Sequence, residues 1–234
     1  YSGQVSAQNY SQRLERLGIK TYYHYTIEGY PHNVALIDSE EGFGKNDYIE
    51  TTRPLVVVTA PGPGSGKMAV CLSQLYNEHV RGNQAGYAKF ETFPVWNLPL
   101  KHPVNKAYEA ATADLNDVNM IDPYHLEAYG ETAISYNRDT EIFPVLDALF
   151  TGIYGHNPYK SPTDMGVNMV GFCMEDDEAC CQASKQEIIR RYYHALNDFA
   201  NGDISEAVVN RIGRLFKQVG ISTADRPTTT AANE

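Results

Sequence analysis

A glycine-rich turn between an apolar run and a helical pattern constrains the fold more than any other feature. Residues 55–60 are continuously apolar apart from one threonine and contain three consecutive valines. Such a run is typical of a strand buried on both faces in a parallel sheet covered by helices. Pro61 to Gly66 follow as a tight turn, and from Lys67 apolar residues return at helical spacing. The pattern predicts an α/β fold in which a parallel or mixed sheet is flanked by helices.

The turn has the chemistry of an anion-binding site. Glycines allow a positive φ and a close approach of the backbone to a ligand, and a helix start offers unpaired N–H groups and the positive end of its dipole. Lys67 directly follows the last glycine, as the lysine of a nucleotide-binding P-loop does, and Ser65 adds a hydroxyl donor. We therefore predict that phosphate is bound by Gly62, Gly64, Ser65, Gly66 and Lys67.

The match to the P-loop motif is incomplete. The standard pattern is GxxxxGK followed by Ser or Thr. Here Pro61 stands at the first glycine position, and Met68 follows the lysine, so the usual magnesium-binding hydroxyl is missing. A proline-glycine turn with a solvent-facing lysine at the helix start is the structural alternative.

Carboxylates downstream of the turn are candidate magnesium ligands. A helix is predicted from Pro103, because apolar residues then recur every three or four positions on one face. Asp114 lies at the boundary of that face, where a carboxylate can hold a hydrated magnesium ion against a phosphate. The predicted metal ligands are Asp114, Asp117 and Asp122, and the alternative is an ordinary solvated helix face.

Two histidines and an arginine are candidates for the chemistry itself. His102 and His125 have side chains that exchange protons near neutral pH, although each stands beside a proline-containing turn where it could simply cap or pack. Arg138 is predicted in a loop before a helix opened by Pro144, where a guanidinium could clamp a phosphate. A local ion pair with Asp139 explains that arginine equally well.

Other segments with regularly spaced apolar residues predict further helices and strands. Residues 8–17 indicate a helix, and two strands are predicted at 19–25 and 85–90. A helix with the stripe Ile188, Tyr192, Leu196 and Phe199 follows an acidic run at 176–178 that favours its positive end. A last helix is expected after the capping pair Asp203 and Glu206, with Val208, Ile212, Leu215 and Val219 buried.

These patterns divide the chain into three parts. We predict an α/β region with the phosphate-binding turn at 1–100, a mainly helical region at 101–227 and a tail or linker at 228–234.

Charge and cysteine usage narrow the expected partners. The formal net charge of −10 argues against broad binding of nucleic acid or anionic membranes, which requires a basic field. No apolar run approaches the roughly 20 residues that cross a bilayer, and residues 1–10 do not resemble a signal peptide, so the cytoplasm is the expected location. The four cysteines have no CxxC spacing and suggest neither a zinc site nor a disulfide framework.

Long stretches of the chain resemble one bacterial family. They are RLERLGIK, KNDYIETTRPLVVVTAPGPGSGK, KFETFPVWNLPLKHPVN, YEAATADLNDVNMIDPYHLEAYGET, YNRD, YKSPTDMGVNM and SKQEIIRRYY. They resemble the family "domain of unknown function 1846", and the resemblance runs over about residues 13–221. The resemblance implies a longer protein of which this chain is the central portion, in agreement with a first residue that is not methionine. It implies no reaction, and it carries over no catalytic residues.

The expected function is binding of a nucleotide or another phosphorylated metabolite, with phosphoryl transfer or hydrolysis as the favoured reaction. Magnesium is the expected cofactor and no organic cofactor is predicted. The expected partner is a phosphorylated small molecule, and a homo-oligomer is among the expectations. Two alternatives stay open: a noncatalytic module that senses a phosphorylated ligand, and a structural or scaffolding protein in which the turn is only a connection.

Overall fold

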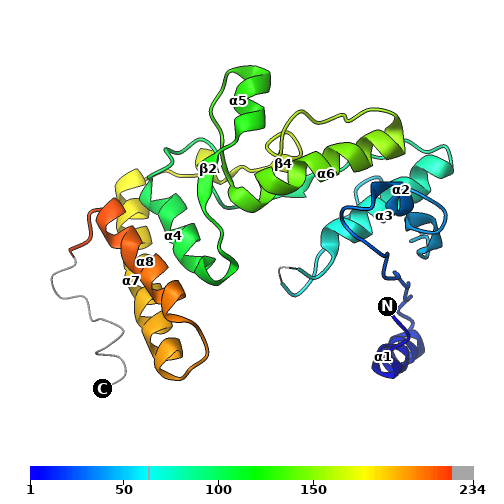
Figure 1. The fold of residues 1–234 in the computed structure, drawn as a ribbon, viewed down its shortest axis with the longest axis horizontal. Coiled ribbons are helices and arrows are strands. Elements are labelled where there is room, and N and C mark those ends of the chain that lie inside the picture. The colour runs from blue at the N-terminus through cyan, green and yellow to red at the C-terminus, as the bar shows by residue number, and fades with distance from the viewer. Residues whose placement is uncertain (63, 223–234) are drawn as a thin grey trace. The chain divides into compact units, whose positions relative to one another are not determined.

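A computed structural model describes residues 1–62 and 64–222 of the chain (Figure 1). The described residues are mainly helical and form two compact units. The first unit comprises residues 1–87 and 144–158, and the second comprises 88–143 and the described residues from 159 on. One boundary between the units falls inside helix α6 (Asn137–Tyr154), at Pro144. The tail predicted at 228–234 lies outside the described residues.

The first unit contains short helices and one long amphipathic helix. Its elements are α1 (Val5–Arg16), α2 (Val34–Ile37), the 3-10 helix η1 (Phe43–Lys45), α3 (Lys67–Val80) and the later turns of α6. The buried apolar side chains are Ile37, Phe43, Leu72, Leu75, Leu146, Leu149, Phe150 and Ile153. The four from α6 recur at helical spacing, and burial of each is worth about 1.5–3 kcal/mol.

Buried amides connect η1 to α3. Asn77 donates to the carbonyl of Phe43 at 3.2 Å, and Asn46 donates to the hydroxyl of Ser73 at 2.9 Å. The side-chain amides of Asn77 and Asn46 thus have partners, which offsets their desolvation.

The strand predicted at 55–60 is wrong, although the helix predicted after it is confirmed as α3. The segment forms no strand, and Leu55 and Val57 are 79% and 80% exposed. A strand needs a neighbour for its backbone hydrogen bonds, and no described residue pairs with this segment.

The strand predicted at 19–25 is also wrong. Side-chain oxygens of Asp47 and Asn46 accept the backbone N–H groups of Tyr23 and Tyr25, at 2.7 and 2.8 Å, so no strand ladder forms there.

The second unit is built on a helical core. Figure 1 shows α4 (Pro103–Ala111), α7 (Asp177–Ala200) and α8 (Glu206–Gln218) packed side by side. Their shared core contains Ala110, Ala113, Ile188, Tyr192, Ala195, Leu196, Val209, Ile212, Leu215, Phe216 and Val219. The predicted stripes on α7 and α8 are confirmed, with Phe199 and Val208 only partly buried.

Helix termini in this unit test the predicted boundaries. The acidic run does begin α7, because the Asp176 carboxylate accepts from the N–H of Ala179 at 2.9 Å. The predicted capping residue Asp203 is wrong: Ser205 occupies the N-cap of α8. Pro103 is the first residue of α4 as predicted. That helix ends at Ala111, so Asp114 lies on the separate 3-10 helix η2 (Ala113–Leu115) and not on the face of α4.

Two small sheets bring distant segments together. Strands β1 (Lys89–Phe90) and β4 (Gly166–Val167) pair in parallel, while β2 (Asn119–Ile121) and β3 (Ile134–Tyr136) pair antiparallel. A parallel pair is thus present, but the strand predicted at 85–90 is reduced to β1. Gly166 must be small, because a Cβ there would lie 2.5 Å from the ring of Trp96.

Connections around these sheets place the candidate residues. Helix α5 (Pro123–Tyr129) links β2 to β3, and the 3-10 helix η3 (Val170–Phe172) follows β4. Helix α6 begins directly after β3 at Asn137, so the expected start at Pro144 is wrong and Arg138 lies in the first turn of the helix, not in a loop. No helix within residues 1–62 and 64–222 is long and apolar enough to cross a membrane.

Candidate functional site

The glycine-rich turn lies at the start of α3, where the sequence predicts it. Gly66 is the N-cap residue of this helix, with a φ of 84°, and Gly64 has a φ of 67°. A residue with a Cβ is strained at these backbone angles, which favours glycine. A Cβ on either residue would meet nothing within 4 Å, so open space surrounds this part of the turn. Residue 63 lies outside the described residues.

The first turn of α3 has backbone N–H groups that no described protein group accepts. No described residue accepts a hydrogen bond from the N–H groups of Lys67, Met68 or Ala69. The first turn contains no acidic residue, and Gly66 supplies no side-chain cap. Helix starts with free donors are favourable for anions.

Ser65 and Lys67 close the turn on one carbonyl. The ammonium of Lys67 donates to the carbonyl of Gly62 at 2.9 Å, and the hydroxyl of Ser65 donates to the same oxygen. The N–H of Gly62 donates to the Ser65 hydroxyl at 3.2 Å. Among the described carboxylates, none forms an ion pair with Lys67. Its charge is therefore balanced by no neighbouring acid and is available to a ligand.

In the second unit, Asp117 and Arg138 form an ion pair. Asp117 is 1% exposed, and its Oδ2 accepts from Arg138 Nη2 at 2.8 Å and from the hydroxyl of Tyr108 at 3.2 Å. Its Oδ1 is buried and has no hydrogen-bond partner among the described residues. Burial lowers the pKa of Arg138, but Asp117 outweighs that effect and leaves the pKa raised. The guanidinium is about half exposed and keeps donors for an outside acceptor.

Asp122 is fully buried, and both of its oxygens accept protein donors. Oδ1 caps α5 through the N–H groups of Tyr124 and His125, at 3.0 and 3.1 Å. Oδ2 accepts from the N–H and the hydroxyl of Thr163, at 3.1 and 2.6 Å. The ring of His125 lies 3.1 Å from the hydroxyl of Ser161. These contacts attach α5 to the segment around Thr163. Asp114, the other predicted metal ligand, is exposed on η2.

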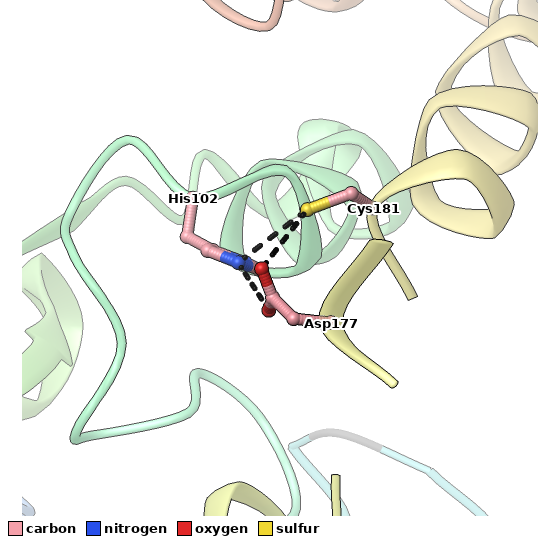
Figure 2. A group of neighbouring side chains, drawn as sticks. All are labelled: His102, Asp177 and Cys181. Atoms are coloured by element: carbon pink, nitrogen blue, oxygen red, sulfur yellow. Dashed lines mark hydrogen bonds and ion pairs between the residues drawn. The ribbon is translucent and has the colours of Figure 1, made fainter. Parts of the chain in front are cut away.

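His102 is in contact with two residues that the sequence reading did not select. Its Nδ1 accepts from the N–H of Val104 at 3.3 Å, which caps α4. Its Nε2 lies 3.0 Å from Asp177 Oδ1 and 3.5 Å from Cys181 Sγ, as Figure 2 shows. Burial, and then the charge of Asp177, raise the pKa of the Cys181 thiol. The thiol is thus not held as a reactive thiolate.

A partly buried ionic cluster around Lys89 is the most notable group that the predicted site omits. The Lys89 ammonium lies 2.6 Å from Glu91 Oε1, donates to the Tyr136 hydroxyl at 2.6 Å, and pairs with Asp139. The side chains of Lys89, Glu91 and Asp139 are 24%, 11% and 13% exposed. Two carboxyl groups therefore share one ammonium in a poorly solvated place.

Burial and neighbouring charges shift the pKa values of this cluster. Burial is the main reason that the pKa of Glu91 is raised, and Asp139 adds to the effect against the opposing charge of Lys89. Burial lowers the pKa of Lys89, but Asp139 and Glu91 outweigh it and leave that pKa raised. A carboxyl group whose pKa is raised beside a lysine is a candidate for proton transfer.

The sequence carries a signal for this cluster that is visible only in hindsight. Lys89 and Glu91 flank a strand residue, and Tyr136 and Asp139 stand at a strand-to-helix junction. The contacts join Lys89 to residues 47 and 50 positions further along the chain, which local spacing does not reveal.

Comparison with known families assigns the chain. The family described as "Domain of unknown function DUF1846, N-terminal" matches residues 1–220. The chain belongs to this family. The predicted resemblance to DUF1846 is thereby confirmed, but the matched part is the N-terminal domain, so the predicted central position is wrong.

Curated relatives of this DUF1846 chain carry the name UPF0371 protein. One from Corynebacterium urealyticum is 62% identical over 225 residues, which are 96% of the chain and 45% of the relative. One from Streptococcus pneumoniae (strain JJA) is 60% identical over 234 residues, 100% of the chain and 47% of the relative. One from Streptococcus thermophilus (strain ATCC BAA-491 / LMD-9) is 61% identical over 232 residues, 99% and 47% respectively. The chain spans about half the length of these relatives, and their names state no activity.

Proposed function

We propose that the turn at the start of α3 binds the phosphate group of a small molecule such as a nucleotide. One observation carries the proposal: the first-turn N–H groups of α3 have no described acceptor, and the neighbouring Lys67 ammonium has no described acidic partner. Donors and positive charge thus occur together at a solvent-accessible place.

The energetics favour a phosphate over water at this place. The helix start contributes about half a positive charge, and Lys67 contributes a full one. A phosphate monoester carries about −1.5 to −2 at neutral pH, and each hydrogen bond to a charged group is worth about 1.5–3 kcal/mol. Lys67 would exchange the neutral carbonyl of Gly62 for a charged oxygen, which is the stronger acceptor.

Binding is proposed ahead of phosphoryl transfer. Met68 follows Lys67, so the turn has no hydroxyl at the position where a P-loop holds magnesium. Magnesium binding by Asp114, Asp117 and Asp122 stays a separate proposal, and of the two buried aspartates only Asp117 keeps a carboxylate oxygen without a described donor. A catalytic role for His102, His125 and Arg138 is likewise a separate proposal.

Calorimetry with charge variants tests the proposal. ATP, GTP, pyrophosphate and inorganic phosphate are titrated into the chain, each with and without magnesium. Lys67→Ala should weaken binding at least about tenfold, the loss expected for one charge-assisted contact. Lys217→Ala removes an exposed charge from α8 and should leave affinity unchanged. The proposal would be refuted if none of the four compounds binds.

A second pair of variants controls for misfolding. Met68→Glu places a carboxylate in the first turn of α3, where it stabilises the helix but occupies the anion site. Met68→Gln has nearly the same shape without the charge. We expect binding to be lost in the first variant and kept in the second, with circular dichroism unchanged in both. Equal affinities in the two variants would contradict an anion site at this helix start.

Proton transfer is a second candidate function, supported by the Lys89 cluster. Its carrying observation is that Glu91 and Asp139 share one ammonium, with the hydroxyl of Tyr136 in contact. Pools of small carboxylated and phosphorylated metabolites are incubated with the chain in deuterated water, and mass spectrometry measures deuterium incorporation at carbon. Glu91→Gln should abolish incorporation, while Glu28→Gln, at an exposed position, should not. No incorporation by the unmodified chain would remove this candidate.

A further inference from the structure

Three side chains with metal-binding atoms converge at the start of α7. Asp177 and Cys181 are four residues apart in the first turns of the helix and therefore lie on one face. His102 reaches the same place from the N-cap of α4, which packs against α7. Figure 2 shows the imidazole, the carboxylate and the thiol pointing toward one another. One ligand atom from each lies within 4.8 Å of the others.

The separations between these atoms resemble the edges of a zinc coordination tetrahedron. With zinc bonds of about 2.0–2.1 Å to nitrogen, about 2.3 Å to sulfur and about 2.0–2.2 Å to oxygen, the N···O edge is about 3.3–3.5 Å, and the N···S and O···S edges are about 3.5–3.7 Å. In the structure, His102 Nε2 is 3.5 Å from Cys181 Sγ and 3.0 Å from Asp177 Oδ1. Cys181 Sγ is 3.9 Å from Asp177 Oδ2. Each separation is within about half an ångström of the corresponding edge. The nitrogen and the sulfur contact different oxygens of Asp177, so a small rotation of this exposed carboxylate would present one oxygen to both.

The arrangement does not fit a nucleophilic triad. In such a triad the acid contacts one ring nitrogen of the histidine and the nucleophile contacts the other. Here both Asp177 and Cys181 approach Nε2, while Nδ1 accepts from the N–H of Val104. Convergence of a carboxylate and a thiol on one ring nitrogen is what a shared cation would produce.

Charge and proton balance are consistent with a divalent ion. A thiolate and a carboxylate together neutralise the two positive charges, and imidazole binds as a neutral ligand. Cys181 would release its proton to solvent. The proton on His102 Nε2 would be replaced by the metal, and the neutral ring would carry its proton on Nδ1, giving up the 3.3 Å hydrogen bond from Val104.

The site is open on one side. Asp177 is 68% exposed, whereas the His102 side chain is only 10% exposed. Three protein ligands beside solvent leave a fourth position for water or for a small ligand, as in catalytic zinc sites. Asp176 and Glu178, exposed beside Asp177, add negative potential that attracts cations.

We propose that His102, Asp177 and Cys181 bind one divalent transition-metal ion, with zinc as the preferred ion. The set of one nitrogen, one oxygen and one sulfur atom suits borderline ions and discriminates against magnesium and calcium, which prefer oxygen alone. This metal site contains no residue of the phosphate-binding turn, and its ion is not the magnesium expected there.

Cobalt titration followed by absorbance provides the test, because a thiolate bound to cobalt gives a charge-transfer band that a free thiol lacks. The unmodified chain should develop this band with one equivalent of cobalt and lose it on addition of zinc. Cys181→Ser should lose the band, while Cys180→Ser, at the adjacent cysteine, should keep it. No band in the unmodified chain, or equal loss in the two serine variants, would overturn the proposal.

Two further variants separate metal binding from helix capping. His102→Asn removes the metal ligand but keeps a favourable N-cap for α4, so the chain should fold and bind zinc at least about tenfold more weakly. Asp177→Asn should weaken zinc similarly. Lys67→Ala should bind zinc as the unmodified chain does, which keeps failure of the metal site distinguishable from failure of the phosphate site. Unchanged zinc affinity in His102→Asn would overturn the assignment.

Discussion

The carboxyl group of Asp38 provides the clearest quantitative prediction. Asp38 directly follows α2 in the first unit, and neither of its oxygens, both buried, has a described hydrogen-bond partner. The carboxyl group packs closely against Gly152 of α6, because a Cβ at Gly152 would lie 2.1 Å from Asp38 Oδ2. Burial raises the pKa of this carboxyl from 3.8 to about 7. Ionisation of Asp38 should therefore destabilise the folded state, and Asp38→Asn should remove that effect.

The magnitude follows from linkage between protonation and folding. A rise of the Asp38 pKa from 3.8 to about 7 corresponds to at most about 4 kcal/mol of unfolding free energy. The side chain is only about half buried, so solvent screening reduces the expected effect to about 2 kcal/mol. Because the pKa is raised in the folded state, the stabilising proton is fully bound below about pH 4. It is lost as the pH rises through about 7, so stability of the unmodified chain falls over that window.

Urea unfolding at several pH values measures the effect. The stability of Asp38→Asn relative to the unmodified chain should increase by about 2 kcal/mol between pH 4 and pH 8. Circular dichroism reports global unfolding, and hydrogen exchange of peptides covering 34–45 and 146–152 reports the surroundings of Asp38. Asp203→Asn, at an exposed position, should show a difference that does not change with pH. A pH-independent difference for Asp38→Asn would refute the reasoning.

Three further predictions concern the second unit. Lys89→Met leaves Glu91 and Asp139 without their ammonium, so urea unfolding at pH 7 should show a loss of about 3 kcal/mol, and the loss should shrink at pH 4 as the carboxyls protonate. Asp122→Ala removes the cap of α5 and the acceptor for Thr163, so amide exchange in α5 should accelerate by at least about tenfold, whereas unchanged exchange would argue against this role. Leu215→Ala leaves a cavity between α7 and α8 and should cost about 2–5 kcal/mol in thermal or urea unfolding.

Helices were predictable because their signals are local. The start of α3 after Gly66 and of α4 at Pro103 follows from residues within one turn, and the stripes of α7 and α8 follow from spacing alone. The strand predictions at 19–25 and 55–60 were wrong because strand formation depends on residues that are distant in the sequence. Residues 55–60 have the composition of a buried strand, but composition does not supply the neighbour with which a strand must pair.

The same distinction applies to the candidate sites. The glycine turn, Ser65 and Lys67 are contiguous and could be selected together from the sequence. His102 and Asp177 are 75 residues apart, and Lys89 and Asp139 are 50 apart, so only the folded chain brings them into contact. Cysteine spacing likewise gave no indication of a metal site, because its three ligands come from two helix starts and not from one motif.

The contact between Trp96 and Gly166 has a practical consequence for studying this chain. Trp96 is the one tryptophan in the sequence, and it lies in the second unit, against the glycine that pairs β4 with β1. When excited at a wavelength that tyrosine does not absorb, its fluorescence reports on that unit alone, because the first unit contains no tryptophan. Melting curves recorded by fluorescence and by circular dichroism would coincide if the two units unfold together. They would separate if each unit unfolds by itself, which gives a label-free measure of their cooperativity.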